Sequence, residues 1–121
     1  MSEQTVFSRI LSGEIPARRV YEDDQCIVIE DRAPQAPTHL LIIPRKPLVN
    51  LAAAQKEDAP LLGHLMWVAS ELARRLGLEE SGFRVIINNG SGAGQTVFHL
   101  HIHLLAQCTM CEGDLAQDLP Q

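Results

Sequence analysis

The longest regular pattern of hydrophobic positions lies between residues 59 and 76, where apolar side chains recur three and four residues apart. This spacing is typical of a helix with one apolar face. Asp58 precedes the run as a plausible N-cap, and Gly77 follows it as a C-terminal stop. We therefore expect one long helix over residues 59–76. Its predicted apolar face consists of Leu62, Leu65, Met66, Ala69, Leu72, Ala73 and Leu76.

Shorter runs rich in β-branched and other apolar residues predict five strands, over residues 20–22, 26–29, 40–43, 83–87 and 97–105. Residues 40–43 are apolar throughout, which indicates a central strand covered on both faces. Residues 6–11 precede Gly13 and Pro16 and predict a short N-terminal helix. The fold class is therefore α+β, with a mostly antiparallel five-stranded sheet and the long helix on one face. Such a sheet commonly pairs an exposed edge across a two-fold axis, so we expect a homodimer.

Length and composition indicate one domain. The chain has 121 residues, of which 45% are hydrophobic and 21% charged, and it shows no repeat or linker. We expect a single domain over residues 1–121, with residues 106–121 as a C-terminal tail.

The charge distribution limits the classes of ligand. The net charge is −5 and there is no block of Lys and Arg, which argues against a polynucleotide partner. A small anion remains possible, because backbone N–H groups can bind one without a basic surface. No apolar run has the length of a membrane span, and the first residues lack a leader pattern. Three cysteines do not suggest a disulfide framework, so we expect a cytoplasmic protein without a membrane partner.

Three histidines alternate with apolar residues in the last predicted strand. His99, His101 and His103 would share one face, while the apolar residues between them would face the core. Exposed strand faces usually carry Thr, Lys or Glu, so this pattern favours a catalytic or ligand-binding function for the histidines. His99 and His103 lie roughly 13 Å apart along a regular strand, too far for all three to hold one ion. Two of them with His39 or a cysteine could still form a zinc centre.

The segment before these histidines is polar and contains Gly90, Gly92 and Gly94. Glycines permit backbone conformations in which successive N–H groups point at an anion. The segment lacks the Gly-Lys-Ser/Thr ending of a P-loop, so by itself it fits either a phosphate-binding loop or a flexible connection.

Taken together, several segments closely resemble the histidine triad (HIT) family, in its Hint-like branch. They are residues 14–17 (EIPA), Asp31, residues 34–44 (PQAPTHLLIIP), residues 61–66 (LLGHLM), Asn88, residues 94–98 (GQTVF) and residues 99–105 (HLHIHLL). The resemblance covers nearly the whole chain. It implies a HIT-like fold and a purine nucleoside phosphoramidase or related nucleotidyl hydrolase. Such an enzyme cleaves at the α-phosphate of a purine nucleotide, with adenosine as the expected nucleoside, through a covalent nucleotidyl-histidine intermediate, with no cofactor and no metal.

The resemblance also assigns roles to individual residues. His101 would be the nucleophile, its second ring nitrogen held by a backbone carbonyl. His103 and His39 would form a supporting pair, one touching the phosphate or leaving group and the other orienting it, and His99 would serve for positioning. The nucleotide-binding positions are Asp31 for the ribose, the adjacent Arg32 without an assigned role, and Asn88, Gly94, Gln95 and Thr96 for the α-phosphate. His64 belongs to the helix pattern and is interpreted as structural.

This chain departs from the family at both ends. Thr5 and Ser8 stand where zinc-binding relatives carry cysteines, so their structural zinc is not expected. Beyond the triad the usual Gly-Gly-Arg is replaced, so the resemblance leaves the leaving group open. Residues 106–121 would lie near the leaving-group side, so their removal should change discrimination among leaving groups more than the attack itself. Cys108 and Cys111 form a C-x-x-C pair that is weak evidence for a metal or redox function. Two other hypotheses therefore stay open, a non-catalytic nucleotide-binding or scaffolding protein and a His-ligated metalloenzyme.

Overall fold

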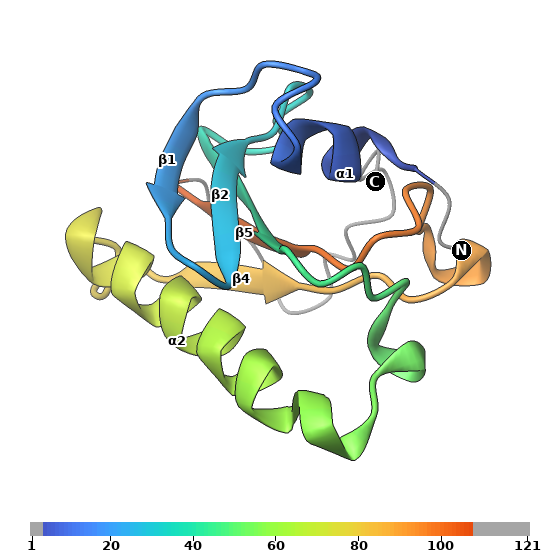
Figure 1. Cartoon of the computed structure of the whole chain (residues 1–121). Coiled ribbons are helices and arrows are strands. Elements are labelled where there is room, and N and C mark those ends of the chain that lie inside the picture. The colour runs from blue at the N-terminus through green and yellow to red at the C-terminus, as the bar shows by residue number, and fades with distance from the viewer. Residues whose placement is uncertain (1–3, 108–121) are drawn as a thin grey trace.

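Five strands form one antiparallel sheet in the order β1-β2-β3-β5-β4. The computed structural model describes residues 4–107 (Figure 1). The strands are β1 (Arg19–Glu22), β2 (Cys26–Glu30), β3 (Thr38–Pro44), β4 (Phe83–Ile86) and β5 (Ile102–Ala106). The helices are α1 (Val6–Leu11) and α2 (Ala59–Arg75), with short 3-10 turns η1 (Leu51–Ala53), η2 (Lys56–Asp58) and η3 (Ser91–Ala93). The predicted α+β fold class is confirmed.

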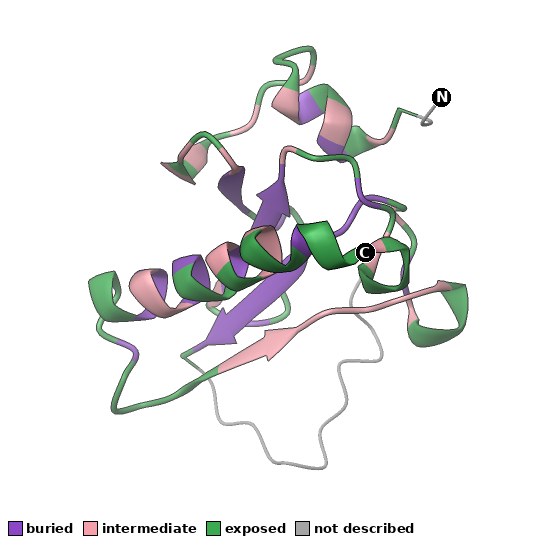
Figure 2. Ribbon diagram, turned by 60° about the horizontal axis from the view of Figure 1, so that its bottom comes forward, coloured by how far each residue is buried: buried purple, intermediate pink, exposed green. Residues whose placement is uncertain are grey.

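The central strand β3 separates two hydrophobic layers. It pairs with β2 on one side and β5 on the other, and it is buried from its second residue onward. Leu40 and Ile42 belong to the layer that contains α2, and Leu41 and Ile43 to the layer that contains Phe7 of α1. Successive strand residues point to opposite faces, so the all-apolar run in β3 contributes to both layers, as predicted. Figure 2 shows the buried strands with α2 across them.

The buried face of α2 differs in part from the predicted one. Leu65, Ala69, Leu72 and Ala73 are buried, together with Val68. By contrast, Met66 and Leu76 are 42% and 47% exposed. The face is centred on positions 65, 69 and 72, and the side chain of residue 66 projects about 100° away from that of residue 65.

The ends of α2 also qualify the predicted caps. Asp58 holds the N-cap position, but its side chain makes no capping bond. Its carboxylate instead accepts the Gln55 N–H at 2.8 Å and pairs with Lys46. Gly77 has φ +69°, a conformation that glycine adopts readily, and it follows the helix as predicted.

The predicted strand over residues 97–105 is wrong in its first half. Regular pairing begins only at Ile102, and residues 97–101 bond outside the sheet. The Leu100 N–H donates to the Leu48 carbonyl at 2.6 Å, and the Val97 carbonyl accepts the Gln95 amide at 3.0 Å. Phe98 is 47% exposed rather than packed in the core.

The structure also bears on the predicted absence of a membrane span, on dimer pairing and on the tail. Among residues 4–107, the helices lack the combination of length and apolar character needed to cross a bilayer. Strands β1 and β4 form the sheet edges, and pairing of an edge with a second copy stays a prediction. Cys108, Cys111 and most of the predicted tail lie outside the described residues.

Candidate active site

The side chains of residues 99–104 alternate between the two faces of the sheet even where the backbone is not a regular strand. Leu100, Ile102 and Leu104 enter the α2 layer, whereas His99 and His101 contact Phe7 of α1. The Phe7 ring lies edge-on to His101, with 4.8 Å between centroids, and 6.3 Å from His99. The His101 and His103 ring centroids are 5.1 Å apart. The three histidines therefore lie on the face opposite to the long helix.

His101 has its tautomer fixed by the backbone. Its Nδ1 lies 2.7 Å from the His99 carbonyl oxygen, in a buried environment. A carbonyl oxygen only accepts hydrogen bonds, so Nδ1 must carry the proton. In the neutral imidazole the lone pair is then on Nε2, where a nucleophile needs it. His99 is fixed in the same way, since its Nε2 donates to the Pro44 carbonyl at 2.7 Å.

His39 and His103 form a directed hydrogen-bonded pair. The Gln35 N–H donates to His39 Nδ1 at 3.0 Å, which leaves the His39 proton on Nε2. This Nε2 lies 2.9 Å from His103 Nδ1, and 3.4 Å from a carboxylate oxygen of Asp31. His39 therefore donates to His103, whose own proton is placed on Nε2. The side chains come from neighbouring strands β3 and β5 at diagonal positions.

Burial lowers the pKa of two of these histidines. Desolvation is the main cause for His39, where the Asp31 carboxylate acts in the opposite direction. Desolvation also lowers the pKa of His99, against the effect of its bond to Pro44 and with a small contribution from His101. Both imidazoles are therefore held in the neutral form, consistent with the acceptor role of His39 Nδ1.

This burial predicts a loss of stability in mild acid. Below about pH 6.5 the unfolded chain binds protons at His39 and His99 that the folded chain does not, so the free energy of unfolding decreases as the pH falls. The slope is at most about 1.4 kcal/mol per pH unit for each histidine. Urea unfolding at about pH 7.5 and about pH 5.5 measures it, and His99→Asn should reduce the slope. Equal or greater stability at the lower pH would contradict the prediction.

The glycine-rich segment before the triad is organised by the buried side chain of Gln95. Its Oε1 accepts the Gly90 N–H at 2.7 Å, and its Nε2 donates to the carbonyls of Val49 and Val97 at 2.8 and 3.0 Å. The side-chain amide thus braces the loop from within. A contact of Gln95 with a phosphate stays a prediction.

The remaining predicted phosphate positions lie along the same loop. Gly90 and Gly94 have φ of +85° and +92°, and Asn88 lies beside Gly94. Thr96 is exposed at the exit of the loop. The structure thus brings these positions into one loop, and their contacts with a nucleotide stay predictions.

Substitutions at two of the glycines should distinguish a stability cost caused by backbone conformation from one caused by lack of space for a side chain. Gly94→Ala places a Cβ on a backbone with φ +92° and should cost about 1 kcal/mol of unfolding free energy. Gly92→Ala is the matched control, because Gly92 has no positive φ and an added Cβ meets nothing within 4 Å. Chemical denaturation of the two variants measures the difference. Equal stability would show that the loop adjusts freely at position 94.

Asp31 and Arg32 are adjacent in the sequence but differ in burial. Asp31 is buried, with Oδ1 accepting the Ala33 N–H at 2.8 Å, and with His39 it lines a cavity of about 320 Å³. Arg32 is exposed. The structure thus places Asp31 with the histidine pair and gives Arg32 no position in that cluster.

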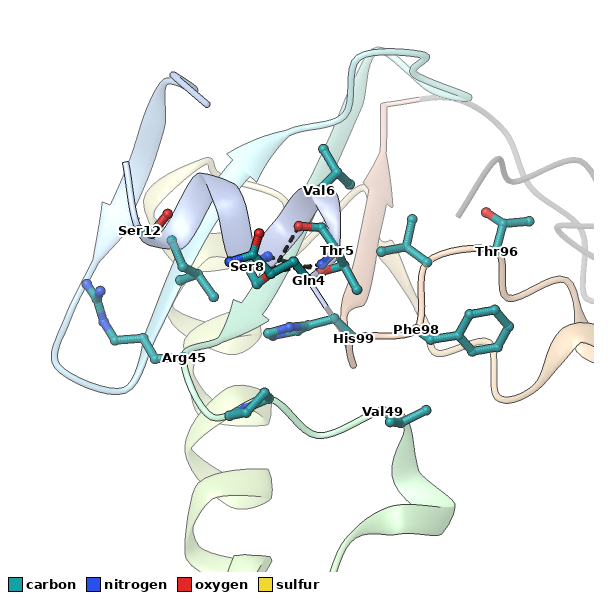
Figure 3. Close-up of a pocket in the computed structure, with 13 residues that line it drawn as sticks. Gln4, Thr5, Val6, Ser8, Ser12, Arg45, Val49, Thr96, Phe98 and His99 are labelled. Carbon is teal, nitrogen blue, oxygen red and sulfur yellow. Dashed lines mark hydrogen bonds between the residues drawn. The ribbon is translucent and has the colours of Figure 1, made fainter. Parts of the chain in front are cut away.

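Thr5 and Ser8 occupy the start of α1 beside His99 (Figure 3). Thr5 Oγ1 accepts the Ser8 N–H at 3.1 Å and Ser8 Oγ accepts the Thr5 N–H at 2.8 Å, a capping box. Both hydroxyls therefore cap the helix. A cavity of about 1140 Å³ adjoins them and is also lined by Arg45, Thr96 and His99. His101 and His103 do not line it, so the predicted nucleophile lies outside this cavity.

The profile of the HIT domain family matches residues 12–110. The chain belongs to the HIT family. An uncharacterized HIT-like protein of Synechocystis sp. is 56% identical to this HIT protein over 105 residues, which cover 87% of this chain and 91% of the relative.

Solved HIT structures share the fold. A HIT family hydrolase from Legionella pneumophila Philadelphia 1 has a TM-score of 0.88 and 42% identity, over 91% of this chain and 98% of that one. A histidine triad nucleotide-binding protein from Candida albicans has a TM-score of 0.76 and 28% identity, over 92% of this chain and 86% of that one. These matches confirm the resemblance to the HIT family, whereas the Hint-like branch stays a prediction.

Three groups that organise this HIT site are absent from the sequence prediction. The carbonyl of Pro44 fixes His99, the N–H of Gln35 fixes His39, and the ring of Phe7 packs on His101. Two of these are backbone groups, which every residue carries, so no residue type could signal them. Phe7 was predicted only as part of a short packing helix.

Proposed function

We propose that this HIT protein is a Hint-like nucleotidyl hydrolase that cleaves purine nucleoside phosphoramidates at the α-phosphate through a nucleotidyl-His101 intermediate. The observation that carries the proposal is the 2.7 Å contact of His101 Nδ1 with the His99 carbonyl. It leaves the lone pair on Nε2 without requiring a strong base. The HIT family hydrolase among the structural relatives supports the reaction class, and the nucleotide-binding protein among them supports the ligand class.

In the first step, His101 Nε2 forms a bond to the α-phosphorus while the bond from phosphorus to the amine breaks. An amine leaves poorly unless it is protonated. The His103 Nε2–H is the proposed donor, and the His39 Nε2–H, 2.9 Å from His103 Nδ1, stabilises the deprotonated ring by its hydrogen bond. Water then attacks the phosphorus and gives a proton back to His103 Nε2, and the nucleotide leaves with His101 restored.

The substrate is held on both sides of the reacting atom in this proposal. The Asp31 carboxylate accepts hydrogen bonds from the ribose hydroxyls, and the loop formed by Asn88, Gly94 and Thr96 holds the α-phosphate. The preference for a purine and the homodimer belong to the same proposal.

Mass spectrometry tests the intermediate directly. Full-length protein mixed briefly with an adenosine phosphoramidate should gain the mass of one adenylyl group, and peptide mapping should place it on His101. The His101→Asn variant should gain none, while His99→Asn, which keeps the nucleophile, should still gain the adduct. An adduct on another residue, or turnover by His101→Asn, would remove the proposal.

A metalloenzyme is the second candidate, favoured by one observation. Donor atoms of Asp31, His39 and His103 all lie within 4.8 Å of one another. The ligands would thus come from β3, from β5 and from the residue that follows β2, rather than from the triad alone. Activity lost to chelators and restored by a metal would favour this candidate, whereas nucleotide affinity without any hydrolysis would favour a non-catalytic binding protein.

A further inference from the structure

A second cluster of chemically active side chains lies on the α2 side of the sheet, away from the triad. Asp23 comes from the turn between β1 and β2, Cys26 is the first residue of β2, and His64 belongs to α2. One donor atom from each of the three lies within 4.8 Å of the other two. None of these residues takes part in the proposed hydrolysis.

The carboxylate of Asp23 is held in place from two directions. Its Oδ1 accepts the N–H groups of Gln25 and Cys26, both at 2.8 Å. Its Oδ2 accepts the Tyr21 hydroxyl at 2.9 Å and contacts His64 Nε2 at 2.6 Å. These contacts fix the carboxylate before any ligand binds, so ordering it costs little.

His64 is oriented by a neighbour on its own helix. Its ring stacks on Trp67, with 5.9 Å between centroids and 24° between planes. The imidazole Nε2 thus points toward the hairpin turn and its Asp23 carboxylate.

The cluster has a buried end and an open end. Cys26 is fully buried, whereas the side chains of Asp23 and His64 are 21% and 23% exposed. Solvent therefore reaches the carboxylate and the imidazole, whereas the thiol lies beneath them.

We propose that Asp23, Cys26 and His64 form a binding site for a divalent transition-metal ion of the zinc class. Thiolate sulfur, imidazole nitrogen and carboxylate oxygen are the ligands that Zn²⁺ takes, and three of them with water complete a tetrahedron. Tyr21 and the two backbone N–H groups would then orient the carboxylate around the ion.

Binding releases a proton. Burial, with the nearby Asp23 carboxylate, raises the pKa of the Cys26 thiol to about 12, so the thiol is protonated without metal. The ion displaces this proton to solvent as the metal–sulfur bond forms. Without metal, His64 Nε2 carries the proton that faces the Asp23 carboxylate, because a carboxylate only accepts. On binding, this proton moves to Nδ1 through solvent, and Nε2 of the neutral imidazole coordinates the ion.

Cobalt titration of the full-length chain tests the site. The chain has three cysteines, so in the Cys108→Ser/Cys111→Ser background Cys26 is the remaining thiol. Added Co²⁺ should saturate at one ion per chain, with a thiolate-to-cobalt charge-transfer band. Cys26→Ser should abolish the band, and Asp23→Asn or His64→Asn should weaken binding by about tenfold or more.

His39→Asn is the matched control, because it removes a histidine from the other cluster of possible ligands. It should keep the charge-transfer band. Asp23 and His64 are partly exposed, so their variants test the site even if Cys26→Ser does not fold. Absence of the band in the parent, or unchanged Co²⁺ affinity in His64→Asn, would overturn the proposal. None of these readouts depends on hydrolase activity.

Discussion

We expect His101→Ala to lower kcat/KM for an adenosine phosphoramidate by about four orders of magnitude or more while nucleotide binding persists. The tautomer fixed by the His99 carbonyl makes His101 Nε2 the proposed attacking atom, and alanine offers no substitute. The loop and Asp31 do not depend on this side chain for their internal bonds. Steady-state kinetics measures the loss, and calorimetry with the nucleotide product measures the binding.

His99→Asn is the matched comparison. His99 is buried, lies two residues before His101 in the same alternating pattern, and bonds to the Pro44 carbonyl. Its proposed function, however, is positioning. The decrease in kcat/KM for His99→Asn should therefore be much smaller than the decrease for His101→Ala. Similar losses in both variants, with both folded, would contradict a unique role for His101.

The sequence predicted the sheet because its patterns are local. The alternation in residues 99–105 placed Leu100, Ile102 and Leu104 in the core, although the backbone before Ile102 is not a strand. That irregularity arises from the contact of Leu100 with Leu48, which are far apart in the sequence. A local pattern carries no information about such a partner.

The site was predicted as a set of residues but not as an arrangement. The resemblance named His39 and His103 together, whereas their 2.9 Å contact follows from the pairing of β3 with β5. The direction of that bond depends on a backbone amide of Gln35, which any residue at that position would supply except proline. The Asp23, Cys26 and His64 cluster was missed because its members lie in three separate elements and match no metal-binding spacing.

The directed pair predicts a second large effect, in the form of non-additive losses. His103→Asn removes the proposed donor to the leaving amine and should lower kcat/KM by about two to four orders of magnitude. His39→Asn removes the group that fixes the His103 tautomer across 2.9 Å, so it should cause a loss of similar kind. Because both side chains serve the same proton transfer to the amine, kcat/KM of the double variant should be only slightly lower than that of His103→Asn alone.

A series of leaving groups distinguishes this chain of bonds from a merely structural role. Phosphoramidates with strongly basic amines need the proton most, so both variants should suffer their largest losses there. A substrate with a good leaving group should be cleaved at nearly the parent rate, because attack by His101 is unchanged. Losses that multiply in the double variant, or that are equal for every leaving group, would mean that His39 and His103 act separately rather than as one directed pair.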